Sequence, residues 1–504
     1  MFDPSRLRFI AAVTAACVAV AAHAASASGV GPRFEATACW PAVPAGAHAR
    51  CGYLVVPENR RKHTGRTIRV AVAIIPASAK APGAAPLVYL DGGPGGAPIF
   101  SAGLAVSSGL NADRDLILVD QRGTYYSQPQ LTCPKLDAFF SRLLGLVYDA
   151  ASTRKAHVAA TTACRAHLAA QGVDLAAYST PETVADFSAL RRVLGYKQWN
   201  VYGVSYGTNL ALRLVRADGA GIRSVVLDST EPPNLVALPA FWPQAAHGFA
   251  GLFAACAAQP ACRTRYGDLG ARFAGLVGKL EAHPATASVT DPATKARVTV
   301  TTDGGALANW LVGMSFATPE YKDVPLWIDQ LAAGKPQRIA ASRVSQLTPP
   351  GIVGFGLTFG VICSEWAPFS TRAQILAEGR RALPGYPAAV LAEPPQFTYV
   401  TDDCKVWNVP AAPAADRQPV RSAIPTLILS GIFDAVTALP WGRAAASTLT
   451  NSRVAVFPGV GHGVLYASAC ARTAVNAFYA KPTAAVASCV ANLKPPVFAA
   501  AAEP

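Results

Sequence analysis

The sequence predicts an α/β protein in which a mostly parallel sheet is interrupted by a large, mainly helical insertion. Short apolar runs typical of buried strands alternate with amphipathic helical patterns up to residue 231, stop at about residue 232 and resume after residue 419. The second observation is Gly203-Val204-Ser205-Tyr206-Gly207, which lies between a predicted strand and a predicted helix. We therefore expect a core formed by residues 25–231 and 420–504, and a cap formed by residues 232–419.

Length and N-terminal pattern favour a large exported protein. The chain has 504 residues, 51% of them hydrophobic, which suffices for an extensive core. Arg6 and Arg8 precede an apolar run from Phe9 to Ala22, and Ala22-His23-Ala24 follows, as in a secretory signal peptide over residues 1–24. The run is too short to span a membrane comfortably, and no later stretch predicts a transmembrane segment. We expect a secreted or periplasmic protein.

The cysteines fit an oxidising compartment. Cys17 offers a lipoprotein anchor as an alternative, but apolar sequence continues past it, so cleavage after Ala24 is favoured. The other ten cysteines form sequence-adjacent couples: Cys39 with Cys51, Cys133 with Cys164, Cys256 with Cys262, Cys363 with Cys404, and Cys470 with Cys489. Closing neighbouring loops is the simplest connectivity, although the sequence does not fix it. No CxxC pair or cysteine–histidine cluster indicates a metal, and no cofactor is expected.

The charge does not indicate a nucleic-acid partner. The formal net charge is +14, but the basic residues are scattered and form no Lys/Arg-rich run. A basic exported protein with some attraction to anionic surfaces is the simplest interpretation.

The elements before the insertion follow one another regularly. Two apolar runs separated by a turn predict an antiparallel hairpin, and buried parallel strands follow it. A helix from about Pro181 to Gly195, with Thr180 as its N-cap, leads into the strand before Ser205. The predicted strands are Tyr53–Pro57, Thr67–Val72, Leu87–Leu90, Asp115–Asp120, Gln198–Tyr202 and Ile222–Asp228.

The insertion carries helical patterns and a small hairpin. The helical patterns are Leu252–Cys256, Leu269–Leu280 and Ala306–Met314, and the hairpin pairs Ala287–Thr290 with Arg297–Thr301. Strands resume at Pro425–Gly431 and Arg453–Phe457. An insertion between two strands of a parallel sheet is typical of a lid over the sheet's C-terminal edge.

The pattern around Ser205 predicts a nucleophile. A Gly-x-Ser-x-Gly turn between strand and helix lifts the serine hydroxyl above the sheet edge, and the following helix points its N-terminus at a developing oxyanion. Such a serine needs a base and an orienting carboxylate, in the chain order Ser…Asp…His. Asp434 follows the first strand after the insertion, and His462 follows the next strand in a glycine-flanked loop. We therefore predict a catalytic triad of Ser205, Asp434 and His462.

Two backbone N–H groups are expected to form the oxyanion hole. Tyr206, the residue after the nucleophile, supplies one. Gly93, in the glycine loop Gly92–Gly96 after the strand Leu87–Leu90, supplies the other. A phosphate cradle is the rival interpretation of this loop, but it lacks a following Lys-Ser/Thr and a helix-opening G-x-G-x-x-G.

These motifs together carry a resemblance. Asp91–Gly96, Asp120–Thr124, Gly203–Thr208, Ser430–Thr437 and Gly461–Gly463 resemble the exported prolyl/tripeptidyl aminopeptidase-like family of α/β-hydrolases, with its tripeptidyl-aminopeptidase-like C-terminal region. The resemblance covers nearly the whole mature chain. It implies an α/β-hydrolase fold with a mostly parallel central sheet and a large, mainly helical cap insertion, and release of amino acids or short peptides from free N-termini. Some members of the family behave as esterases.

The sequence departs from the family at several places near the predicted site. Asp91 stands where prolyl iminopeptidases usually have histidine, and Tyr125-Tyr126-Ser127 replaces small residues. Ala435 and Ala438 stand where the family often has proline.

Two function classes remain open, with a peptide or small ester as substrate. A serine aminopeptidase must hold an α-ammonium, which buried carboxylates do best, and Glu231 and Glu365 are the candidates. A carboxylesterase or lipase acting on uncharged acyl esters is the alternative, and would favour a pocket without carboxylates. An ordinary solvated loop is the structural alternative for each glutamate.

Overall fold

The computed structural model describes residues 31–62, 64–81, 83–483 and 485–499. The predicted signal peptide and Cys17 lie outside these residues. Among the described helices, none is both long and apolar enough to cross a membrane.

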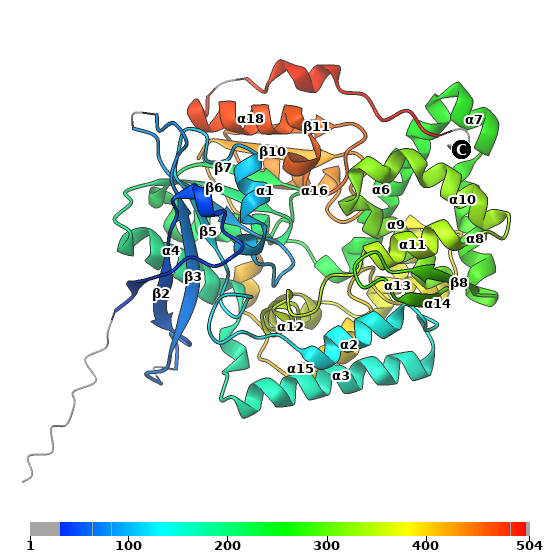
Figure 1. Cartoon of the computed structure of the whole chain (residues 1–504), viewed down its shortest axis with the longest axis horizontal. Coiled ribbons are helices and arrows are strands. Elements are labelled where there is room, and N and C mark those ends of the chain that lie inside the picture. Colours follow the sequence, from blue (N-terminus) through cyan, green and yellow to red (C-terminus); the bar gives the residue numbers. More distant parts are fainter. Residues whose placement is uncertain (1–30, 63, 82, 484, 500–504) are drawn as a thin grey trace, which may run out of the picture. The chain divides into compact units, whose positions relative to one another are not determined.

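Within the described residues, nine strands form one sheet whose central and C-terminal part is parallel (Figure 1). The first three strands are antiparallel to their neighbours, and the other six run parallel to one another. In spatial order the strands are β1 (Arg33–Thr37), β2 (Arg50–Pro57), β3 (Thr67–Ile75), β5 (Leu116–Val119), β4 (Leu87–Leu90), β6 (Trp199–Val204), β7 (Ile222–Asp228), β10 (Thr426–Gly431) and β11 (Ser452–Phe457). The predicted fold class is confirmed, while β1 was not predicted.

Alternating side chains of the central strands pack into two separate hydrophobic layers. In β4, Leu87 and Tyr89 face one layer, and Val88 and Leu90 face the other. The first layer is covered by α1 (Ala102–Ser107), α17 (Val464–Ala467) and α18 (Ala469–Ala480). The second is covered by α4 (Thr180–Val193), α5 (Tyr206–Asp218) and α16 (Leu439–Ala446). Both faces of the parallel sheet are therefore buried, as its continuous apolar strands require.

The segment between β7 and β10 is mainly helical. It contains the helices α6 (Ala237–Ala258), α7 (Pro260–Tyr266), α8 (Leu269–Ala282), α9 (Gly304–Gly313), α10 (Val324–Ala332), α11 (Gln337–Ser345), α12 (Phe355–Val361), α13 (Arg372–Ala382), α14 (Ala388–Leu391) and α15 (Val400–Trp407). A two-stranded antiparallel sheet, β8 (Ala285–Thr290) with β9 (Arg297–Thr302), matches the predicted hairpin.

Two helices from before Ser205 pack with this segment rather than with the sheet. They are α2 (Pro134–Leu143) and α3 (Ala151–Ala170), and their buried residues share one hydrophobic cluster with α6, α12 and α15. Figure 1 shows α2, α3 and α15 side by side. The helical layer is thus built from two stretches of the chain, and the sequence indicated only the second.

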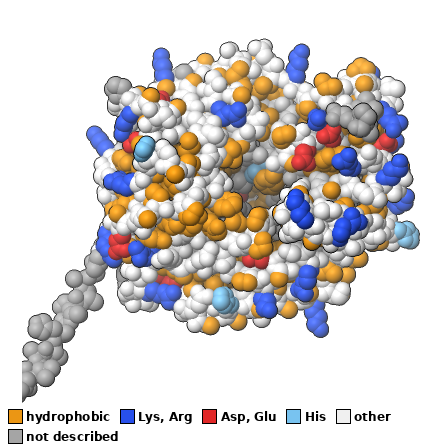
Figure 2. Space-filling view, viewed as in Figure 1, with side chains coloured by type: hydrophobic (Ala, Val, Ile, Leu, Met, Phe, Trp, Pro, Cys, Tyr) orange, Lys and Arg blue, Asp and Glu red, His pale blue; other side chains and the backbone are white. Residues whose placement is uncertain are grey.

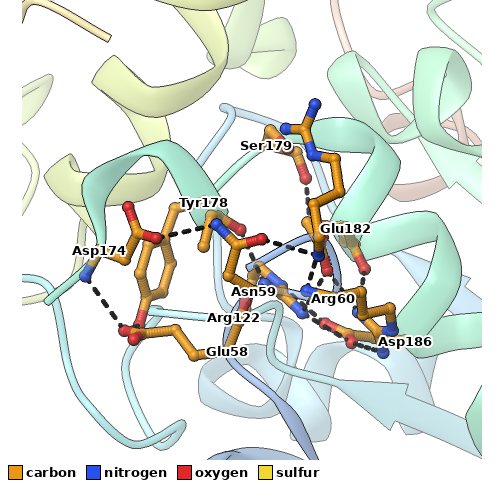
Figure 3. Close-up of polar contacts among 12 residues, drawn as sticks. Glu58, Asn59, Arg60, Arg122, Asp174, Tyr178, Ser179, Glu182 and Asp186 are labelled. Carbon is orange, nitrogen blue, oxygen red and sulfur yellow. Dashed lines mark hydrogen bonds and ion pairs between the residues drawn. The ribbon is translucent and has the colours of Figure 1, made fainter. Parts of the chain in front are cut away.

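A buried ion-pair network ties the loop after β5 to α4 (Figure 3). Arg122 is fully buried and donates two hydrogen bonds of 2.8 Å to the Asp186 carboxylate. It also donates to the carbonyl oxygen of Glu58, at the end of β2. Arg60 pairs with Glu182 and with Asp186, both at 2.6 Å. Arg122 therefore has a structural role.

The ten described cysteines form five disulfides, in the couples that adjacency in the sequence favoured. Cys133–Cys164 joins α2 to α3, and Cys363–Cys404 joins the π-helical turn Ile362–Trp366 to α15. Cys256–Cys262 joins α6 to α7, so three of the five bridges tie together the helical layer.

Candidate active site

Ser205 occupies a tight turn between β6 and α5. Its backbone has φ 58° and ψ −132°, a conformation that a non-glycine residue adopts only when its surroundings impose it. The flanking glycines are sterically required. A Cβ at Gly203 would lie 2.5 Å from the carbonyl oxygen of Gly207, and one at Gly207 would lie 2.1 Å from that of Leu90. The turn therefore presents the serine hydroxyl at the C-terminal edge of the sheet, where the neighbouring strand loops end.

Asp434 and His462 form a buried pair at the same edge. Nδ1 of His462 lies 3.0 Å from Oδ2 and 3.2 Å from Oδ1 of Asp434. The carboxylate also accepts hydrogen bonds from the backbone N–H groups of Val436 and Thr437. Burial raises the pKa of Asp434, but the His462 ring and these hydrogen bonds outweigh it, so the pKa lies below its usual value. Asp434 is therefore an anion that orients the imidazole.

His462 shares a cavity with Ser205. Nε2 of His462 is buried without a hydrogen-bond partner among the described residues. A base with its Nδ1 held by a carboxylate leaves Nε2 to accept a proton. In a structure without substrate the serine–histidine contact is commonly long, and it shortens when the reacting group binds.

Residues that the sequence analysis did not single out hold the His462 loop. The Asp228 carboxylate, at the end of β7, accepts hydrogen bonds of 2.8 Å from the N–H groups of Val464 and Leu465. Ser315, from the segment between β7 and β10, accepts the His462 N–H on its carbonyl oxygen and the Ala435 N–H on its hydroxyl. The position of Asp228 at a strand end was the available signal. Ser315 had none, because its two contacts span more than a hundred residues.

The glycine loop after β4 packs directly on Ser205. A Cβ at Gly92 would lie 2.7 Å from the Ser205 Cβ, and Gly93 has φ 113°, which glycine tolerates best. Tyr206 is the first residue of α5, so its N–H belongs to the unpaired first turn. The carboxyl group of Asp91 accepts a 2.9 Å hydrogen bond from the Gly92 N–H, and burial raises its pKa. The loop and the start of α5 thus flank Ser205, which is where a serine nucleophile would need oxyanion donors.

The cavity beside Ser205 has a volume of about 770 Å³ and mostly apolar walls. This volume lies in the upper part of the range of about 300–1,000 Å³ that small-molecule sites occupy. Figure 2 shows a hollow bordered by hydrophobic side chains. Two of the apolar lining residues, Leu104 and Phe316, are about half exposed, and the Phe316 ring packs edge-on against His462 at 4.8 Å between centroids.

Glu231 places a buried carboxyl group in this cavity. It follows β7, is 4% exposed and accepts a 3.1 Å hydrogen bond from the Asn209 amide on Oε1. Burial raises the pKa of Glu231 to about 8, against the opposing effects of Asn209 and Arg213. The carboxyl group is therefore largely protonated at neutral pH, and a cation beside it would lower its pKa.

Glu365, the second glutamate predicted to bind the substrate's ammonium, is not among the residues that line this cavity. One of its oxygens lies 2.9 Å from the Arg213 guanidinium, and the other accepts a 2.8 Å hydrogen bond from the Thr180 N–H. Thr180 is the first residue of α4 rather than its N-cap, so the carboxylate of Glu365 satisfies a helix N-terminus instead. Glu365 joins the helical layer to α4 and α5.

Comparisons with known proteins agree with this geometry. Residues 85–468 match the family described as alpha/beta hydrolase fold. Two curated proteins named tripeptidyl aminopeptidase, from Streptomyces coelicolor and Streptomyces lividans, are each 30% identical over 200 residues. Each of these matches covers 37% of this chain and 36% of the relative, so the chain spans about a third of the relatives' length. The resemblance drawn from the motifs is thereby confirmed.

Solved structures also align over most of the chain. A crystal structure of proline iminopeptidase from Mycobacterium smegmatis covers 86% of this chain and 98% of its own, at 17% identity and a TM-score of 0.40. The match of residues 85–468 takes in the six parallel strands of the sheet and the predicted triad, while β1, β2 and β3 lie before it. The chain belongs to the alpha/beta hydrolase fold family.

Proposed function

We propose that the protein is an exported serine hydrolase of the aminopeptidase type. In this proposal Ser205 attacks the carbonyl carbon of a substrate amide, and neutral His462 accepts the hydroxyl proton at Nε2. Asp434 holds the imidazole through Nδ1 and stabilises its protonated form. The N–H groups of Tyr206 and Gly93 donate to the oxyanion. His462 then protonates the leaving amine, and water releases the acyl group from Ser205 by the same steps in reverse.

The observation that carries the aminopeptidase proposal is Glu231, a buried carboxyl group in the wall of the cavity that contains Ser205. A site built only for uncharged acyl groups has no use for it, since burying a carboxyl group costs free energy. A substrate with a free α-ammonium supplies the charge that compensates this cost. The five disulfides support export, because disulfides persist in oxidising compartments.

The division of the chain is also a proposal. We assign residues 232–419 as a cap over the site, because this segment supplies Ser315 and Phe316 to the surroundings of His462. We include α2 and α3 in this layer, because their buried residues share a hydrophobic cluster with the segment. A cap that covers one side of the cavity would admit a chain end and exclude the middle of a folded protein.

An esterase is the second candidate, because the cavity walls are mostly apolar. Hydrolysis of aminoacyl and peptidyl p-nitroanilides with free N-termini, of their N-acetylated forms and of short-chain p-nitrophenyl esters separates the two. We expect Glu231→Gln to lower kcat/KM for aminoacyl amides with a free amine by a factor equivalent to roughly 1–3 kcal/mol of lost binding free energy, and to leave acetylated amides and esters nearly unchanged. Equal losses on all three substrates would favour the esterase.

A further inference from the structure

A second polar cluster lines the cavity and has no role in the proposed chemistry. It consists of His157 on α3, Asp403 on α15, and Tyr148 and Tyr399 from the segments before these helices, and we call it the distal cluster. In Figure 1, α3 and α15 lie at the lower edge of the view, well apart from β10 and β11, whose following loops carry Asp434 and His462. The same cavity thus has polar groups at two separate places.

The distal cluster is an ordered site, because a buried carboxylate fixes its histidine. Nε2 of His157 lies 2.8 Å from Oδ2 of Asp403, and the Thr161 hydroxyl donates a 2.7 Å hydrogen bond to Oδ1. His157 is 3% exposed and Asp403 is 2% exposed. With Nε2–H donated to Asp403, the neutral ring carries its lone pair on Nδ1.

Two buried polar atoms of this cluster lack partners. Among the described residues, neither Nδ1 of His157 nor the hydroxyl of Tyr399 has a hydrogen-bond partner, although Tyr399 is only 1% exposed. Leaving buried polar groups unpaired costs roughly 1–3 kcal/mol each. Both residues line the cavity, so a ligand that enters it can satisfy them.

The charge and the aromatic faces around these atoms favour a cation. Asp403 brings a carboxylate, and His157 packs against the rings of Tyr399 and Phe139 at 5.1 and 4.8 Å between centroids. Arg154, the nearby cation over the Tyr399 ring, is paired with Glu393 and Asp402 at 2.7 and 2.6 Å. A carboxylate behind an acceptor nitrogen, with aromatic rings beside it, is the environment that suits an ammonium group.

We propose that the distal cluster binds the free α-ammonium of short peptides whose acyl end is attached to Ser205. The ammonium would donate to Nδ1 of His157 and to the Tyr399 hydroxyl, and Asp403 would balance its charge through the imidazole. This inference rests on the proposed function, because it assigns the site to the N-terminal end of the same substrate.

The cavity then contains two ammonium sites at different places along its length. Glu231 suits the ammonium of a single aminoacyl group. For a longer acyl portion, Glu231 meets neutral peptide backbone, to which its protonated form donates a hydrogen bond. The distal cluster favours release of short peptides over release of single amino acids, and the two sites are separable by mutation.

The test compares alanyl-p-nitroanilide with trialanyl-p-nitroanilide. Tyr399→Phe removes one hydroxyl without changing the ring, and Asp403→Asn removes the charge behind His157. We expect each to lower the ratio of kcat/KM for the tripeptidyl over the aminoacyl substrate by about tenfold or more, as a lost hydrogen bond to a charged group implies. Glu231→Gln should raise this ratio. The matched control is Tyr386→Phe, which should leave the ratio unchanged. Tyr386 is a buried tyrosine of the helical layer that does not line the cavity.

A binding measurement separates this inference from the proposed function. Calorimetry compares the Ser205→Ala protein with the Ser205→Ala/Asp403→Asn double variant. We expect trialanine to bind the double variant with an affinity about tenfold or more lower, and N-acetyl-trialanine to bind both proteins with equal affinity. Equal affinities of trialanine for the two proteins, or an unchanged substrate ratio in Tyr399→Phe, would overturn the distal site. Failure of the wild-type protein to cleave any free-amine amide would instead overturn the proposed function, and the binding result would still decide the site.

Discussion

At the scale of single residues, the protonation of Glu231 has a measurable consequence for stability. Its pKa is raised to about 8 in the folded protein, while an unfolded glutamate has a pKa of about 4.3. Between these values the unfolded chain ionises while the folded one holds its proton. The stability contributed by the protonated group is therefore complete below about pH 4.3 and is lost as pH rises through about 8.

Glu231→Gln removes this titration while keeping an oxygen that accepts from Asn209. We expect the difference in melting temperature, variant minus wild type, to increase as the pH rises from about 5 to 8. The increase should correspond to at most a few kcal/mol in the free energy of unfolding. Asp120, whose pKa burial raises to about 7, titrates in both proteins and cancels in the difference. A difference that is flat with pH would show that Glu231 is ionised in the folded protein.

At the scale of elements, removing Arg122 should destabilise the protein more than removing an exposed arginine. Arg122→Leu leaves Asp186 and Glu182 with fewer partners in a buried position, and breaking a buried pair typically costs about 3–5 kcal/mol. Arg381→Leu, which breaks an exposed pair with Glu378, should cost about 0–1 kcal/mol. Denaturant unfolding of both variants checks the contrast, and similar losses would contradict it.

The sequence predicted some elements of this fold and not the contacts between distant ones. The buried strands and the turn at Ser205 were recognisable, because a parallel sheet requires continuous apolar strands and the turn requires its glycines. The contacts of Glu365, Ser315 and His157 were not recognisable, since each joins segments far apart in the chain. A single carboxylate gives no sign of whether it will face a cavity, as Glu231 does, or a helix N-terminus, as Glu365 does.

At the scale of the whole molecule, the disulfides are expected to hold the helical layer together. Cys363–Cys404 ends next to Asp403, and Cys133–Cys164 joins α2 to α3, the helix that packs on α15. Removing a disulfide from a small domain typically lowers the free energy of unfolding by roughly 2–5 kcal/mol. In this larger core, replacing both Cys363 and Cys404 by serine should cost no more than that. Thermal unfolding tests this, and mass spectrometry of the unreduced protein should find no free thiols in residues 31–499. Several free thiols would contradict the pairing.

The measurement that tests the central claim most directly is covalent labelling of the nucleophile. A fluorophosphonate reacts with a serine only where a base and an oxyanion site activate it. We expect one adduct, on the peptide that contains Ser205, together with loss of hydrolysis. Labelling should be absent in Ser205→Ala and at least about a thousandfold slower in His462→Ala. An adduct on another serine, or hydrolysis by Ser205→Ala at the wild-type rate, would contradict the assignment of Ser205 as the nucleophile.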